Sequence, residues 1–345
     1  MRFDPRAPWR RLPPLWVRSL GALLWLVGIS FAHYSLNYDH GEQRMVRMGY
    51  MPVITNLAAP LLDYTSQEDD GVRFKALKFS SFAEMGEALR NKTIDVGFMI
   101  APLPIVLRQQ GVDVKVVAIG NRHESTLVAR KGLNARRIED LAGKTVAVPM
   151  RFSGHNLAIH RLLEEKGLLG QVKVVEMNPP DMAAGLAAGS LDAYFVGEPF
   201  AAKSVKAGLA DPVLYVEDYW PRFMCNVMVT RRDFIEQDPK LVQRMVQAAA
   251  RVNAWAGQHR AEAAKIAARY WSQPEELVLY AMDTPPGRVR FDMFAPVEQE
   301  YQQMADLMQH FGLLEKNDIR GLVDDRFAKA ADVTGVTDDL RSAVK

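Results

Sequence analysis

Residues 82–102, FAEMGEALRNKTIDVGFMIAP, and residues 179–199, PPDMAAGLAAGSLDAYFVGEP, carry the same residue pattern at a constant offset of 97 positions. The pairs that match at this offset are Pro52 and Pro149, Met85 and Met182, Leu89 and Leu186, Asp95 and Asp192, Phe98 and Phe195, Pro102 and Pro199, and Gly111 and Gly208. The pattern predicts two similar lobes with a cleft between them, where small ligands commonly bind. The competing interpretation is that the matches arise by chance, because two stretches of alternating helix and strand have similar spacings of apolar residues.

The composition of the chain is that of a globular protein. Its 345 residues suffice for two domains, with 48% hydrophobic and 24% charged residues. Cys225 is the single cysteine, which excludes an internal disulfide and any multi-cysteine metal site. The sequence holds no P-loop, no nucleophile elbow, no H-E-x-x-H and no G-x-G-x-x-G. We therefore expect a protein that is not an enzyme and needs no cofactor or metal.

The first 32 residues form a separate segment. Five arginines and one aspartate precede or flank an apolar run from Leu20 to Ala32. This is the pattern of an export signal, and the run is short for a membrane span of about 20 residues. A signal peptide over residues 1–32 and an uncleaved anchor beginning near Leu15 are the two interpretations. Without this segment the net charge changes from +2 to −2, so no nucleic-acid partner is expected.

Hydrophobic periodicity predicts an α/β fold of two lobes, each an open mixed sheet flanked by helices. Residues 33–44 are a predicted linker. Lobe 1 is predicted over residues 45–124 plus 228–333, lobe 2 over residues 125–227, and a tail over residues 334–345. The predicted strands are 45–50, 72–79, 94–100, 114–119, 144–149, 172–177 and 191–197, with extended segments at 213–217 and 225–230. The predicted helices are 54–64, 82–90, 154–166, 181–188, 241–259, 261–270, 297–311 and 319–327.

The candidate binding residues lie where predicted strands end, because ligands of open α/β sheets bind outside the carboxyl ends of the strands. Four loops and one segment between the lobes supply them. They are Pro52, Thr55 and Asn56; Ala101 and Pro102; Ser153, Gly154, His155 and Asn156; Glu198; and Arg222.

These side chains have competing roles. Ser153 and Gly154 stand before a predicted helix, where backbone N–H groups attract an anion, although Ser153 as a simple helix cap is an equal alternative. Glu198 follows an apolar strand and is suited to a ligand cation, a metal or an ion pair between the lobes. Arg222 is either an anion contact or a surface arginine.

Several motifs together resemble those of a known family. Ile94-Asp95-Val96-Gly97, Leu141-Ala142-Gly143-Lys144-Thr145-Val146-Ala147 and Val196-Gly197-Glu198-Pro199-Phe200 are similar to segments of solute-binding proteins of ABC importers. The subgroup is the nitrate, sulfonate, taurine and thiamine-precursor type. The resemblance implies a periplasmic-binding fold of type II that closes on a small anionic or polar solute such as nitrate, bicarbonate or a sulfonate.

The resemblance also implies partners and a location. The solute would pass to an ABC permease and its ATPase, from a monomer outside the cytoplasm, with membrane contact through the N-terminal segment or the permease. The chain lacks the lipobox cysteine of lipid-anchored members. An enzyme of the thiamine-pyrimidine or menaquinone-pathway type on the same fold and a ligand-sensing receptor are the alternatives.

Overall fold

The computed structural model describes residues 14–37, 44–68 and 71–343, and the chain divides into two compact units, Met1–Arg44 and Met45–Lys345. The first unit contains helix α1 (Leu15–Asn37). Its segment Leu15–Ser35 is long and apolar enough to cross a membrane by length and composition, and none of it is buried. The helix extends beyond the apolar run Leu20–Ala32 on both sides, and the signal peptide and the anchor both stay predictions. The predicted linker 33–44 falls partly in α1 and partly outside the described residues.

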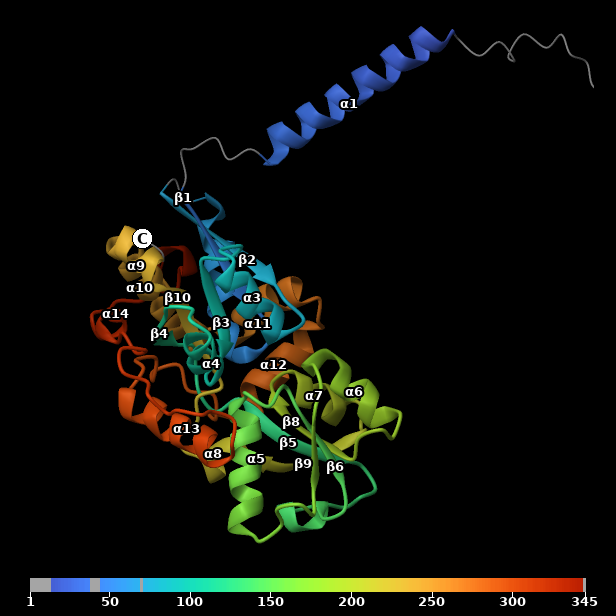
Figure 1. The fold of residues 1–345 in the computed structure, drawn as a ribbon, viewed down its shortest axis with the longest axis vertical. Coiled ribbons are helices and arrows are strands. Elements are labelled where there is room, and N and C mark those ends of the chain that lie inside the picture. The colour runs from blue at the N-terminus through green and yellow to red at the C-terminus, as the bar shows by residue number, and fades with distance from the viewer. Residues whose placement is uncertain (1–13, 38–43, 69–70, 344–345) are drawn as a thin grey trace, which may run out of the picture. The chain divides into compact units, whose positions relative to one another are not determined.

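Two five-stranded sheets form the framework of the second unit (Figure 1). The strand order in the first sheet is β2-β1-β3-β10-β4, and in the second it is β7-β6-β8-β5-β9. The strands are β1 (Arg44–Tyr50), β2 (Val72–Lys78), β3 (Val96–Ile100), β4 (Val114–Ile119), β5 (Ser125–Arg130), β6 (Thr145–Val148), β7 (Lys173–Glu176), β8 (Ala193–Gly197), β9 (Ala210–Tyr215) and β10 (Asn226–Arg231). We call each sheet with its packed helices a lobe, lobe 1 for the first sheet and lobe 2 for the second.

Both sheets are mixed, as predicted. In lobe 1, β1 runs parallel to β3, while β10 runs antiparallel between β3 and β4. In lobe 2, β6 runs parallel to β7 and β8, while β5 runs antiparallel between β8 and β9. The chain crosses from one lobe to the other at residues 120–124 and returns at residues 220–225. The first strand after each crossing is thus the antiparallel one.

The 97-residue repeat corresponds to equivalent positions in the two lobes. Met85 in α3 (Phe82–Arg90) and Met182 in α6 (Pro179–Ala187) are both fully buried. Phe98 and Phe195 occupy β3 and β8. Beyond α4 (Leu103–Gln109) and α7 (Phe200–Lys206), Gly111 and Gly208 both have positive φ, a conformation that glycine adopts without strain. The prediction of two similar lobes is confirmed.

The remaining helices surround the sheets. They are η2 (Ile54–Asn56), α2 (Ala58–Thr65), η3 (Ser66–Glu68), η4 (Ile138–Leu141), α5 (Gly154–Glu165), α8 (Val216–Tyr219), α9 (Arg232–Gln237), α10 (Pro239–Gln258), α11 (Arg260–Trp271), α12 (Glu275–Asp283), α13 (Glu298–His310), α14 (Arg326–Lys329) and η5 (Leu340–Ala343). As expected, the C-terminal region is helical: α10 and α11 pack against α2 in lobe 1. Helix α12 contacts α11 and also α7 of lobe 2.

The predicted helix over residues 319–327 was wrong. The backbone N–H of Val116 in β4 donates to Leu322 O at 2.9 Å, and the N–H of Asp324 donates to Val116 O at 2.9 Å. These bonds form a β-bridge between Val116 and Val323. The free edge of β4 therefore draws the segment into extended pairing, and the helix begins only at Arg326. Likewise, β9 begins at Ala210, and α8 replaces the end of the predicted extended segment 213–217.

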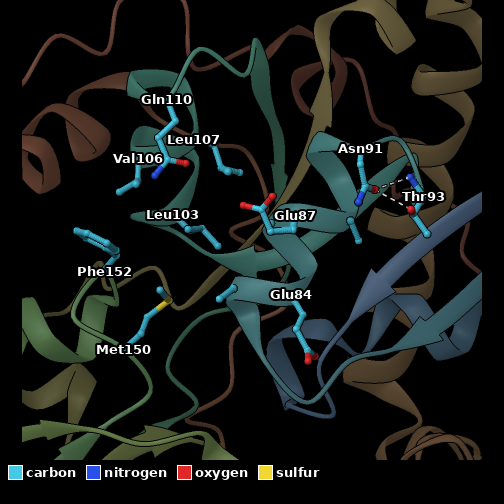
Figure 2. A pocket seen from close by; sticks show the side chains of 13 residues that line it. Glu84, Glu87, Asn91, Thr93, Leu103, Val106, Leu107, Gln110, Met150 and Phe152 are labelled. Carbon is cyan, nitrogen blue, oxygen red and sulfur yellow. Dashed lines mark hydrogen bonds between the residues drawn. The ribbon is translucent and has the colours of Figure 1, made fainter.

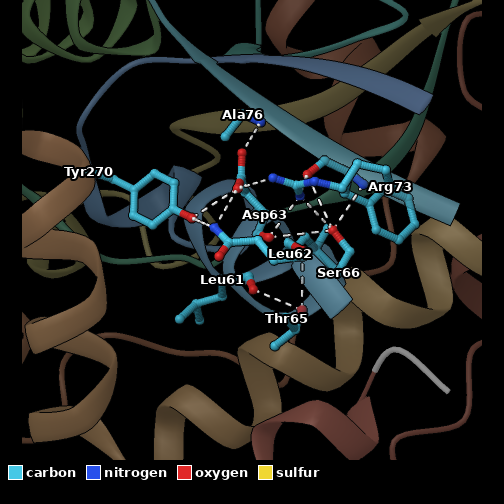
Figure 3. A network of polar contacts seen from close by, with 10 residues as sticks. Leu61, Leu62, Asp63, Thr65, Ser66, Arg73, Ala76 and Tyr270 are labelled. Atoms are coloured by element: carbon cyan, nitrogen blue, oxygen red, sulfur yellow. Dashed lines mark hydrogen bonds and ion pairs between the residues drawn. The ribbon is translucent and has the colours of Figure 1, made fainter. Parts of the chain in front are cut away.

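A buried carboxylate joins three elements of lobe 1 (Figure 3). Asp63 of α2 is 5% exposed, and its Oδ1 accepts hydrogen bonds from Arg73 Nη2 at 2.8 Å and from Tyr270 OH at 2.9 Å. Its Oδ2 accepts the backbone N–H of Ala76 at 2.7 Å. Since Arg73 and Ala76 belong to the edge strand β2 and Tyr270 to α11, this one side chain ties the strand and both helices together.

Candidate functional site

The predicted loops meet at the two crossings between the lobes. The N–H of Ile54 donates to Glu198 O at 2.8 Å, which joins the loop after β1 to the loop after β8. The N–H of Ala101 donates to Cys225 O at 2.9 Å, which joins the loop after β3 to the second crossing. Asn226 Nδ2 donates to Asn56 Oδ1 at 2.8 Å. The interface between the lobes is thus built from backbone and side-chain polar groups of both.

Glu198 is a buried acid within this interface. Its side chain accepts hydrogen bonds from Thr126 Oγ1 at 2.8 Å and from the N–H of Ala202 at 2.7 Å. The Nη1 atom of Arg288 lies 3.8 Å from Glu198 Oε1. Burial raises the pKa of the Glu198 carboxyl to about 7, because desolvation penalises the charged form more than these partners favour it.

Arg288 links the C-terminal region to lobe 2. Its guanidinium donates to the carboxylate of Glu217 at 2.8 and 3.1 Å, to Ser125 O at 2.9 Å and to Thr126 Oγ1 at 2.9 Å. It also lies 4.4 Å from the centroid of the Tyr215 ring. Arg288 is only 7% exposed, so its buried guanidinium is balanced and hydrogen-bonded by these partners.

Glu124 is a second acid, fully buried in the first crossing. Its Oε2 accepts the N–H of Glu198 at 2.6 Å, and its Oε1 accepts the hydroxyl of Ser125 at 3.2 Å. Burial raises the pKa of this carboxyl. A Cβ at Gly197 would lie 2.7 Å from Glu124 Oε2, so the close approach requires glycine there.

His155 is buried at the start of α5. Its Nε2 lies 2.9 Å from Ser125 Oγ and 3.9 Å from Cys225 Sγ, and its ring makes edge contacts with Phe195 and Phe223. Its Nδ1 finds no hydrogen-bond partner among the residues that the structure describes. Burial lowers the pKa of His155 to about 3, so the imidazole is neutral at physiological pH and offers no positive charge to an anion.

The neighbours of His155, from Ser153 to Asn156, form the N-terminal end of α5. Ser153 Oγ accepts the N–H of Asn156 at 3.1 Å, and Asn156 Nδ2 donates to Arg151 O at 2.9 Å. A Cβ at Gly154 would lie 2.8 Å from the Phe223 ring. Ser153 thus serves as the helix cap, which was one of the two predicted roles.

The remaining predicted residues divide into two groups. Thr55 Oγ1 lies 3.5 Å from Glu124 Oε1 inside the interface, and Ala101 and Pro102, in the loop after β3, are buried. Pro52 is half-buried. The guanidinium of Arg222 is 55% exposed and pairs with Glu300, outside the cluster around Glu198.

Sequence reasoning missed Glu124, Thr126, Asn226 and Arg288. The first two lie at the start of β5, a strand that was not predicted. The signal in the sequence that could have identified Glu124 is its charge between two apolar segments, Val114–Ile119 and Ser125–Arg130. No local signal marks Arg288, because its partners lie more than 70 residues away in the sequence.

Two hollows lie where lobe 2 meets α3. The first, about 570 Å³, is lined mainly by α3 and α4, with Met150 and Phe152 of lobe 2 at one end (Figure 2). The second, about 410 Å³, is lined by residues 81–83 of lobe 1 and by residues 149–150, 176–178 and 181 of lobe 2. Ala83 and Met150 line both. Within the described part of the chain, no group of three His, Cys, Asp or Glu residues is arranged to hold a metal ion.

Comparison with known proteins places this arrangement in a family. The model of the NMT1-like family matches residues 39–271. The taurine-binding periplasmic protein of Escherichia coli is 27% identical over 54% of this chain and 58% of its own length. A putative aliphatic sulfonates-binding protein of Bacillus subtilis is 22% identical over 85% of this chain and 90% of its own. The ligand-binding component of an ABC-type import system from Staphylococcus aureus, solved with zinc bound, superposes with a TM-score of 0.76 at 21% identity, over 85% of this chain and 100% of that one. The predicted α/β fold of two mixed sheets is thereby confirmed, and the chain belongs to the NMT1-like family.

Proposed function

We propose that this protein is the substrate-binding component of an ABC import system and holds a small polar or charged solute between its two lobes. The observation that carries the proposal is the convergence of polar groups from both lobes, from the first crossing and from Arg288 around Glu198. Two lobes joined by two short crossings can move as rigid bodies, and a ligand that contacts both stabilises the closed arrangement. The named relatives are binding proteins, which supports binding without turnover.

The lobe boundaries and the site residues are part of the proposal. We assign residues 45–124 and 228–333 to lobe 1 and residues 125–227 to lobe 2. The two sheets support this division except at Asn226 and Val227, which belong to β10 in the sheet of lobe 1. Within the site, we assign Thr55, Asn56, His155 and Glu198 to the polar floor of the cleft, where they hold the loops in place. The two hollows beside α3 are the space that a solute would enter.

The location and partners follow from the same comparison. We propose that the protein works outside the cytoplasm, because the taurine-binding relative is periplasmic. Helix α1 is long enough to serve as a retained anchor or as a signal sequence. The receptor would act as a monomer that delivers its solute to a permease and an ATPase.

A thermal-shift screen of the full chain in neutral lipid nanodiscs tests this function. The panel contains taurine, alkanesulfonates, nitrate, bicarbonate and alkylamines. At a hundredfold excess over Kd, a ligand should stabilise the native state by about 2.7 kcal/mol. Phe152→Ala should reduce the shift if the solute enters the hollows, and Val333→Ala, away from both hollows, should not. If no compound shifts the unfolding temperature of the chain, the receptor function is not supported.

A further inference from the structure

We propose that the solute carries a positively charged group on an apolar body, and that it lies in the two hollows between α3, α4 and the Met150–Phe152 segment. This inference deepens the proposed function and rests on it. It selects an organic cation or zwitterion over a bare oxyanion.

The larger hollow provides an apolar wall. Leu103, Val106 and Leu107 line it from α4, and Met150 and Phe152 face them from lobe 2 (Figure 2). Its volume of about 570 Å³ lies within the range of small-molecule sites. An inorganic oxyanion would leave this surface in contact with water, whereas an alkyl or aromatic group would bury it at about 25 cal/mol per Å². The wall therefore favours a solute with an apolar body.

Each hollow is lined by charged residues of one kind, which are acidic. Glu84 and Glu87 line the larger hollow, and Glu176 and Asp181 line the smaller one. Among the described residues that line the two hollows, none is a lysine, an arginine or a histidine. Carboxylates at the rim of an apolar cavity attract a cation and repel an anion, and the effect is stronger where water is partly excluded.

Basic side chains border this space, and they have partners. Arg90 Nη2 lies 3.5 Å from Glu87 Oε1 and also donates to Gln110, and both of these partners line the larger hollow. Arg151 Nε lies 3.7 Å from Glu176 Oε1, and its guanidinium lies 5.2 Å from the Phe152 ring centroid. Deeper in the interface, Arg288 is bound to Glu217. Among the described residues, Glu84 by contrast accepts one long hydrogen bond, from Ser80 Oγ at 3.5 Å. Glu84 is thus the acid best placed to receive the ligand's cation, because Glu87, one turn further along the same helix, already pairs with Arg90.

The test compares two probes with one chain length and opposite charges, hexylamine and hexane-1-sulfonate. Binding is measured by calorimetry on the full chain in neutral phosphatidylcholine nanodiscs. Empty nanodiscs of the same lipid serve as the reference, so that uptake of the probe by lipid is subtracted. We expect hexylamine to bind and hexane-1-sulfonate to bind at least tenfold more weakly.

Three variants separate charge from apolar contact. Glu84→Gln/Glu87→Gln should weaken hexylamine at least tenfold, and Phe152→Ala should weaken both hexylamine and a neutral probe, hexanol. Glu262→Gln, an exposed acid on α11, should change neither. If hexane-1-sulfonate binds and hexylamine does not, the charge inference is wrong while the receptor function stands. If only a small inorganic anion shifts the unfolding temperature in the screen above, the apolar inference is also wrong. If neither hexyl probe binds while taurine does, the larger hollow is not the site.

Discussion

Asp95 and Asp192, 97 residues apart, make the same interaction in the two lobes. Asp95 precedes β3, and its Oδ2 accepts the N–H of Arg47 in β1 at 2.9 Å. Asp192 precedes β8, and its Oδ2 accepts the N–H of Thr145 in β6 at 3.0 Å. Each carboxylate also binds an arginine, Arg47 at 2.8 Å and Arg130 at 2.9 Å. Each thereby fixes the register of two parallel strands at the end opposite the cleft.

Replacing either aspartate with asparagine should destabilise its lobe. The change removes a charge-assisted bond, and we expect a loss of about 1–3 kcal/mol in the free energy of unfolding, larger for Asp95, whose side chain is only 10% exposed. Urea unfolding followed by tryptophan fluorescence measures the loss. Asp318→Asn, whose carboxylate pairs with Arg320 at the surface, is the control and should change stability little. A loss no larger than that of the control would contradict the shared structural role.

The buried carboxylate of Asp63 should contribute more to the free energy of unfolding than the hydroxyl of Tyr270, which donates a hydrogen bond to it (Figure 3). Asp63→Asn leaves Arg73 without its counter-charge, and we expect a loss of about 2–4 kcal/mol. Tyr270→Phe removes one hydrogen bond only and should cost about 1 kcal/mol. Chemical denaturation of the two variants distinguishes these values. Equal losses would mean that the ion pair adds nothing to the hydrogen bonds.

The Glu198 carboxyl should make stability depend on pH near neutrality. Its pKa is raised from 4.5 to about 7 in the folded chain, so the native state binds this proton more tightly than the unfolded state. Its contribution is fully present below about pH 4.5 and is lost as pH rises through 7. The wild type should therefore lose up to about 3 kcal/mol relative to Glu198→Gln between pH 5 and pH 8, by the linkage of pKa to stability.

The comparison with Glu198→Gln isolates this group. His155, whose pKa is lowered to about 3, has the opposite sign: its contribution is present above pH 6.5 and is lost as pH falls toward 3. Both chains contain His155, so its effect cancels. Parallel pH profiles of the two chains would show that Glu198 does not titrate in this range.

Gly120 should tolerate no side chain. It lies in the first crossing, where a Cβ would meet Thr55 O at 1.9 Å, far inside contact distance. Gly120→Ala must separate the crossing from the loop after β1 and should cost more than about 2 kcal/mol, with loss of solute binding. In Gly86→Ala the nearest atoms lie at 3.6 Å, so this helical variant should be neutral or stabilising. Similar unfolding temperatures for both variants would argue against the close contact.

The sequence alone determined the repeat, the order of most strands and helices, and the loops that meet between the lobes. These features depend on residues close together in the chain: the buried strand Val96–Ile100, the cap at Ser153, and the aspartates that precede β3 and β8. The tertiary structure decided the rest. Strand β5 pairs with both β8 and β9, and residues 322–324 are extended because they pair with the edge of β4. Arg288 reaches Glu217 and Ser125 only after both lobes have formed. Hydrogen bonds and ion pairs between distant segments override local propensity, and a single sequence shows periodicity but not these partners.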